Sequence, residues 1–154
     1  MRAGDLAEEY PVVELDTDAL TAARTLAGRR LPGLIVVDRE GEPYTVLPAS
    51  QVLQFLIPRY IQEDPALARV IDERTSDDML RRLAKVAVRE LLPERQNLAD
   101  LPVVDADASI LEVAAVVARV RSPGVAVVDE GRLVGAITVS RLLEHLLPDA
   151  PPEA

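Results

Sequence analysis

Few side chains in this sequence have the types and spacing that catalysis requires. The only histidine, His145, has no cysteine or second histidine with which to complete a metal site. Neither a glycine-rich phosphate loop nor a nucleophile–base pair stands out. Aspartates are numerous, but they fall where helix caps and turns are expected and where aspartate is locally favoured: Asp16, Asp18, Asp38, Asp105, Asp107 and Asp129. The residue types therefore favour a protein that is not an enzyme.

The sequence contains an internal repeat, and this repeat defines the elements that must position any site. Residues 10–20 (YPVVELDTDAL) align with residues 101–111 (LPVVDADASIL), an offset of 91 residues that becomes 90 after one gap. A unit that cannot bury its apolar face alone must pack on its copy, so the repeat predicts two pseudo-symmetric halves. We divide the chain into repeat 1 (1–57), a helical connector (58–96), repeat 2 (97–148) and a tail (149–154).

The spacing of hydrophobic residues along the sequence changes in the same order in both halves. A short extended segment precedes a helical pattern, whose expected N-cap is Asp16 or Thr17 in the first half and Asp107 in the second. Continuous β-branched runs then predict strands buried on both faces, and acidic turns with glycine predict hairpins. Second amphipathic helices close the halves. The predicted strands and closing helices are residues 34–38, 44–47 and 51–57, and residues 125–129, 133–138 and 141–147.

Composition restricts the possible partners and the compartment. The chain has 154 residues, of which 49% are hydrophobic and only 3% aromatic, so valine, leucine, isoleucine and alanine must form the core. The absence of cysteine favours the cytoplasm, and no apolar stretch approaches the roughly 20 residues needed to cross a bilayer. A net charge of −9 would repel a phosphate backbone, so nucleic acid is not an expected partner.

The order strand, helix, strand, strand, helix, found twice, resembles the cystathionine β-synthase (CBS) domain in its paired form, the Bateman module. The resemblance rests on the central strands of the type PGVAVVD and on residues 135–143 (GAITVSRLL). It implies an α/β (α+β) fold in which two β-α-β-β-α repeats pack sheet to sheet. It also implies a ligand such as AMP, ADP, ATP or S-adenosylmethionine in the cleft between the repeats, and a homodimer of two modules.

The family's nucleotide signature is Thr-x-x-Asp at the start of the last helix, and both repeats depart from it. Repeat 2 keeps Thr138 but has Arg141 at the acidic position, whereas repeat 1 has Pro48 and Gln51. A guanidinium beside a helix N-terminus would attract phosphate. The alternative interpretation is that Arg141 is a solvated helix residue and that Arg121 complements a helix dipole. The candidate ligand-binding residues are Ile137, Thr138, Ser140, Arg141, Arg121, Ser50 and Gln51.

The connector is longer than the roughly 2 to 8 residues usual between helices, so it should have its own structure. Thr75 to Asp78 predicts a capping box for a helix that ends before Pro93, and Pro65 predicts the first turn of a preceding helix. This insertion either covers surface within the module or forms a dimer or partner contact.

Two functions follow from the resemblance. The first is a regulatory module that binds an adenine nucleotide or similar anion and modulates a separate enzyme or transporter. The second is a ligand-free dimerisation scaffold with a degenerate cleft. Apolar closing helices, with Phe55 to Ile57 in repeat 1 and Leu142, Leu143, Leu146 and Leu147 in repeat 2, predict a homodimer in either case.

Overall fold

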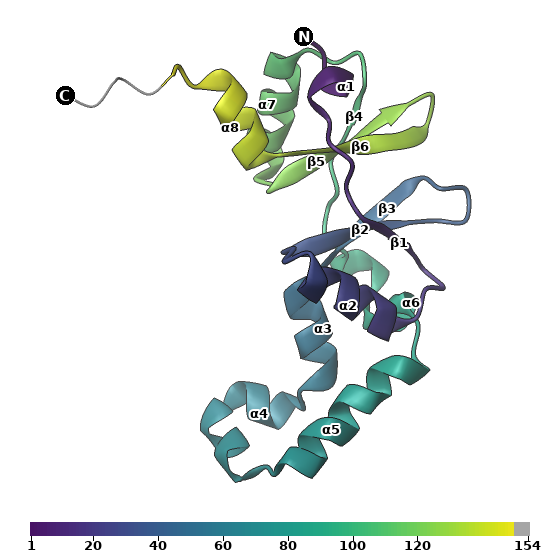
Figure 1. Cartoon of the computed structure of the whole chain (residues 1–154), viewed down its shortest axis with the longest axis vertical. Helices are drawn as coiled ribbons and strands as arrows, with labels where there is room; N and C mark the ends of the chain where they lie inside the picture. Colours follow the sequence, from purple (N-terminus) through teal and green to yellow (C-terminus); the bar gives the residue numbers. More distant parts are fainter. Residues whose placement is uncertain (150–154) are drawn as a thin grey trace, which may run out of the picture. The chain divides into compact units, whose positions relative to one another are not determined.

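The computed structural model describes residues 1–149 apart from the side chain of Ser76 (Figure 1). The described chain forms two compact units. The repeat-1 unit comprises Pro11–Ala99, and the repeat-2 unit comprises Met1–Tyr10 together with the described residues from Asp100 onwards. Each unit has its own sheet and its own apolar core. Of the predicted tail, only Asp149 lies among the described residues.

The repeat-1 unit is a three-stranded sheet with helices on one face (Figure 1). Its elements are β1 (Val12–Glu14), α2 (Ala19–Gly28), β2 (Gly33–Val37), β3 (Pro43–Pro48) and α3 (Ala49–Leu56). β2 lies in the centre, parallel to β1 and antiparallel to β3. All five residues of β2 are buried, as the continuous β-branched run predicts. Leu34 and Val36 pack with Leu47 and with Leu26 of α2 in the core.

The repeat-2 unit has the same order of elements and the same sheet topology. Its elements are β4 (Val103–Asp105), α7 (Ile110–Val120), β5 (Gly124–Asp129), β6 (Arg132–Thr138) and α8 (Val139–Leu146). Glu130 and Gly131 both have positive φ, at 52° and 81°, which suits the tight hairpin between β5 and β6. The predicted α/β class and the β-α-β-β-α order are therefore confirmed in both halves.

Short helices are exchanged between the two halves of the sequence. α1 (Ala3–Leu6) precedes repeat 1 in the chain but packs in the repeat-2 unit, where Ala3 and Leu6 are buried. α6 (Val88–Leu91) precedes repeat 2 but packs in the repeat-1 unit, where Val88 and Leu91 are buried. The units thus differ from the sequence-derived boundaries, because apolar contacts rather than order in the chain place these two helices.

Matched backbone hydrogen bonds hold the two exchanged helices. The Ala3 N–H donates to the Ala108 carbonyl at 2.8 Å, and the Val88 N–H donates to the Thr17 carbonyl at 2.8 Å. In the next pair of bonds, the Gly4 N–H donates to the Ala106 carbonyl at 2.9 Å, and the Arg89 N–H donates to the Leu15 carbonyl at 3.1 Å. The internal symmetry therefore extends to these helices, and Gly4 occupies the place of Arg89.

The predicted caps of the first helices are wrong by one or two residues. Asp18 caps α2 by accepting the Thr21 N–H at 2.7 Å, and Ser109 caps α7 by accepting the Glu112 N–H at 3.1 Å. Thr17 instead stabilises the turn after β1, where its hydroxyl accepts the Glu14 N–H. These turns add residues between strand and helix, which a local capping rule does not anticipate.

The connector consists of several short helices rather than the two predicted ones. They are α4 (Arg59–Glu63), the 3-10 helix η1 (Pro65–Val70), α5 (Glu73–Arg81), the 3-10 helix η2 (Arg82–Lys85), α6, and the 3-10 helix η3 (Arg95–Asn97). Asp72, not Thr75, caps α5 by accepting the Thr75 N–H at 2.9 Å. The predicted long helix breaks at Val86 and Ala87, because these extended residues pair with the start of α2: the Ala19 N–H donates to the Val86 carbonyl at 2.8 Å.

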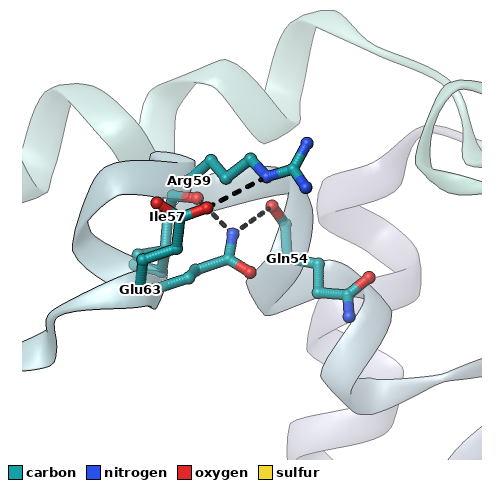
Figure 2. Close-up of polar contacts among 5 residues, drawn as sticks. Gln54, Ile57, Arg59 and Glu63 are labelled. Carbon is teal, nitrogen blue, oxygen red and sulfur yellow. Dashed lines mark hydrogen bonds and ion pairs between the residues drawn. The ribbon is translucent and has the colours of Figure 1, made fainter.

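The side chain of Gln62 joins α3 to α4, beside the ion pair of Arg59 and Glu63 that Figure 2 shows together with Gln54 and Ile57. Its Nε2 donates to the carbonyls of Gln54 at 3.1 Å and Ile57 at 2.6 Å, at the C-terminal end of α3. The last carbonyls of a helix have no partner within the helix, so Gln62 satisfies two of them. Arg59 and Glu63 form an exposed i,i+4 ion pair beside this junction, with 3.4 Å between Nε and Oε1. The junction thereby ties the first helix of the connector to the closing helix of repeat 1.

Candidate functional site

Four of the predicted site residues meet at the junction of β6 and α8. Ile137 is buried in β6 beside Val125, whereas Thr138 and Ser140 are exposed. The Val139 N–H donates to the Pro123 carbonyl at 2.9 Å, which fixes the chain as it turns from strand to helix. The junction therefore presents two hydroxyl groups at the first turn of an eight-residue helix.

Thr138 is the N-cap of α8. Its hydroxyl oxygen accepts the Arg141 N–H at 3.2 Å, which satisfies one of the free donors of the first turn. Because the hydroxyl acts here as an acceptor, its own proton remains available to another group. The backbone N–H groups and the dipole of this turn favour a negative charge.

Arg141 is paired with an acid that lies far away in the sequence. Its Nε is 3.3 Å from Oε1 of Glu8, in an orientation that makes the contact an ion pair without a hydrogen bond from Nε. The Arg141 side chain is only 39% exposed. Glu8 is held in place because its backbone N–H and carbonyl both pair with Ala136 at 2.9 Å. Arg141 is thus neither freely solvated nor free of a counter-charge.

Sequence reasoning missed Glu8 as a neighbour of Arg141. The residue precedes β1 in the chain, and only the exchange of residues 1–10 into the repeat-2 unit brings it to β6. Gly135 permits this close approach, because a Cβ at that position would lie 2.5 Å from the Glu8 carbonyl oxygen. The presence of glycine in the middle of a strand was the available signal, since such a glycine often marks close backbone contact.

The corresponding junction of repeat 1 differs in its cap and in its polar contacts. Pro48 precedes α3 and provides no side-chain cap. Gln51 donates from Nε2 to the Leu91 carbonyl at 3.0 Å and so ties α3 to α6. Ser50 is exposed. Two of the predicted site residues, Ser50 and Gln51, therefore lie in the repeat-1 unit, and one of them has a structural bond.

Arg121 lies at the end of α7 in a left-handed conformation with φ of 55°. Arg30 has the same conformation at the end of α2, with φ of 53°. Glycine is favoured at this position of a helix terminus, so the arginines carry a backbone cost. Arg121 is exposed and precedes Pro123, the residue that binds the start of α8.

The described residues offer little else that points to catalysis. Across residues 1–149, no group of three His, Cys, Asp or Glu side chains is placed to hold a metal ion. None of the helices in the described part of the chain is long and apolar enough to span a membrane. The pKa of Asp18 is lowered mainly by the backbone N–H of Thr21 and then by its hydroxyl, and Thr75 lowers the pKa of Asp72 in the same way.

Two units with one β-α-β-β-α topology define a tandem α/β repeat protein, and comparison with known proteins identifies the family. The sequence model of the CBS domain matches residues 88–148. The structure of a CBS domain-containing protein from Kribbella flavida is 57% identical to this chain, with a TM-score of 0.88, covering 95% of this chain and 98% of that one. This chain belongs to the CBS-domain family, as the sequence repeat predicts.

More distant structures share the fold. The CBS domain of a CBS domain-containing membrane protein from Sphaerobacter thermophilus has a TM-score of 0.72 at 22% identity, covering 96% of this chain and 88% of that one. CBSX2, known from Arabidopsis thaliana, in complex with AMP has a TM-score of 0.62 at 17% identity, covering 94% of each chain. No curated protein matches the sequence.

Proposed function

We propose that this CBS-domain pair is a regulatory protein that binds an adenine nucleotide or a similar anionic metabolite at the β6–α8 junction. The observation that best supports this proposal is that Thr138 and Arg141 lie together at the first turn of α8. In this proposal the bound ligand alters how the protein meets a separate partner, such as an enzyme or transporter in the cytoplasm. The complex of CBSX2 with AMP supports a nucleotide as the ligand class.

The physical chemistry of the junction suits an anion with a diol. The helix N-terminus and the Arg141 guanidinium both favour phosphate. Arg141 stands where the family signature has an aspartate, but the Glu8 carboxylate lies beside it and provides an acceptor for ribose hydroxyls. Glu8 also neutralises part of the Arg141 charge, so it must lower the affinity for a ligand that contributes phosphate alone.

Thermal unfolding with AMP, ADP, ATP, S-adenosylmethionine and NAD tests this proposal. A ligand present at 100 times its Kd stabilises the folded state by about 2.7 kcal/mol, which is a shift of several degrees for a chain of this size. Arg141→Ala should abolish the shift. Arg132→Ala is the matched control, because Arg132 is an exposed arginine of the same unit and lies at the opposite end of β6 from the junction.

Glu8→Gln separates the two roles of Glu8. It should strengthen the binding of inorganic pyrophosphate, because the guanidinium loses its counter-charge, and weaken the preference for a ribose-containing ligand. The backbone pairing of Glu8 with Ala136 does not depend on the side chain, so the fold should be retained. No shift with any of the five ligands at millimolar concentration would favour the ligand-free scaffold instead.

We also propose that the protein is a homodimer that uses the exposed side of α8. Leu143 and Leu146 are 47% and 48% exposed, and Leu147 is 61% exposed just after the helix. Leu142 and Leu56 are buried within their own units and are not available for this contact. A monomer in light scattering at micromolar concentration would contradict the dimer, and Leu143→Glu should dissociate it.

A further inference from the structure

Three arginines surround one hollow on the surface of the repeat-1 unit. The hollow has a volume of about 330 Å³. Arg39 reaches it from the β2–β3 hairpin, Arg89 from α6, and Arg95 from the segment after α6. Tyr44 of β3 lines the same hollow and is 42% exposed. Apolar side chains complete the lining: Leu15, Leu92, Pro93 and Leu98.

This concentration of positive charge is unusual in a chain whose net charge is −9. Asp16 pairs with Arg89 and is the only ion-pair partner that the described residues give to the three arginines. Two of the acids near the hollow in sequence accept hydrogen bonds from groups outside it. Asp38 accepts the N–H groups of Glu40 and Glu42 at 3.0 Å, and Glu94 accepts from Gln96 at 3.0 Å. Arg39 and Arg95 therefore line the hollow without an ion-pair partner among the described residues.

Repeat 2 shows that the fold does not require these side chains. Gly4 takes the place of Arg89 and makes the matching backbone bond, to Ala106 in place of Leu15. Val134 takes the place of Tyr44, since Thr45 and Gly135 oppose equivalent residues of the central strands. The shorter hairpin of repeat 2 has Glu130 where repeat 1 has Arg39 and Glu40. The same backbone thus forms in repeat 2 without counterparts of Arg39, Arg89 and Tyr44.

The side chains that line the hollow favour one class of ligand. Guanidinium groups bind phosphate through paired N–H donors, and arginine is favoured where this geometry matters. The tyrosine ring and the leucine and proline side chains offer an apolar surface beside the charges. Small-molecule sites begin at about 300 Å³ and combine an apolar lining with a few polar groups. The lining of the hollow therefore favours one phosphate group joined to a ring or a short apolar portion.

We propose that this arginine-lined hollow, formed by Arg39, Arg89, Arg95 and Tyr44, is a second ligand site that binds a small organic phosphate. Asp16 holds the Arg89 guanidinium at the hollow through its ion pair. The phosphate lies against the arginines and the organic portion lies against Tyr44 and Pro93. This site is separate from the β6–α8 junction, which belongs to the other unit, and it does not depend on the function proposed for that junction.

An amide NMR titration of the full chain with phenyl phosphate tests the proposal. Shifts should concentrate at residues 39–44 and 89–98. The double variant Arg39→Gln/Arg95→Gln should weaken binding by about tenfold or more, because each lost charge-assisted contact contributes substantially. Both side chains are exposed, so the double variant should unfold at the wild-type temperature. Inorganic phosphate should bind more weakly than phenyl phosphate, because it has no ring to place on Tyr44.

A control variant makes the result specific. Arg132→Gln removes an exposed hairpin arginine from the repeat-2 unit. It should change the affinity measured from the shifts at residues 39–44 and 89–98 by no more than about twofold. Equal weakening by Arg132→Gln, an affinity for inorganic phosphate equal to that for phenyl phosphate, or no shifts at residues 39–44 at millimolar ligand would each overturn the proposal.

Discussion

Replacing Gly135 by alanine should release the N-terminal segment from β6. A Cβ on this residue would lie 2.5 Å from the carbonyl oxygen and 3.0 Å from the carbonyl carbon of Glu8. Contacts this short force a displacement, and the obstacle is backbone rather than the end of a flexible side chain. Glu8 cannot yield locally without cost, because its N–H and carbonyl both pair with Ala136 at 2.9 Å.

The expected loss of stability follows from what the displacement breaks. Two backbone hydrogen bonds contribute about 1 kcal/mol each. Ala3 and Leu6 of α1 are 0% and 4% exposed, and full exposure of a leucine costs about 1.5 to 3 kcal/mol. Partial release of α1 together with loss of both bonds should therefore lower the free energy of unfolding by about 2 to 4 kcal/mol, a large fraction of the 5 to 15 kcal/mol typical of a domain.

Urea denaturation at equilibrium measures this loss, and amide hydrogen exchange at Glu8 and Ala136 locates it. Gly28→Ala is the matched control, because nothing lies within 4 Å of a Cβ at this helical glycine. That variant should gain about 0.5 to 1 kcal/mol, since alanine restricts the unfolded chain and favours the helix. Wild-type stability in Gly135→Ala, with both amides still protected, would refute the close approach of residues 1–8 to β6.

Three further predictions concern single contacts. Thr45 is fully buried and its hydroxyl donates to the Ala99 carbonyl at 2.7 Å, so Thr45→Val should cost about 1 to 3 kcal/mol in urea denaturation; an unchanged midpoint would contradict that bond. Arg121→Gly should raise stability by about 0.5 to 1 kcal/mol, because glycine adopts the left-handed conformation without strain, and a lower melting temperature would show that the arginine side chain outweighs its backbone cost. The Asp18 carboxyl has a lower pKa in the folded state than in the unfolded state because Thr21 donates to it, so its stabilising contribution is present above the unfolded pKa and is lost as the pH falls through the folded pKa. Asp18→Asn should flatten this acid dependence of unfolding, and an identical pH profile for the variant would show that the bond does not act in solution.

Much of the architecture could be predicted because local periodicity encodes it. The runs LIVVD and VAVVD specify central strands buried on both faces, and the described β2 and β5 match them. The aligned repeats indicated two units with one topology. Caps were less predictable, because Asp16, Asp18 and Thr17 all have suitable side chains, and only the turn after β1 decides which of them reaches the first free N–H groups.

The candidate site was only partly accessible from sequence. Ile137, Thr138, Ser140 and Arg141 are neighbours in the chain, so the pattern at the start of the last helix brought them together. Glu8 was not accessible, because more than a hundred residues separate it from Arg141 in the chain. The hydrogen bond from Gln51 to the Leu91 carbonyl could not be predicted either, because α6 lies in the connector, 40 residues after Gln51.

The sequence by itself determined the repeat, the order of strands and helices, the apolar faces and the family. These properties depend on side chains within a few residues of one another, where period and turn chemistry act directly. The tertiary structure decided which short helix packs on which sheet, the pairing of Arg141 with Glu8, and the convergence of Arg39, Arg89 and Arg95 on one hollow. Such contacts join residues that lie far apart in the chain, so they are set by the summed packing of the folded units rather than by any local pattern.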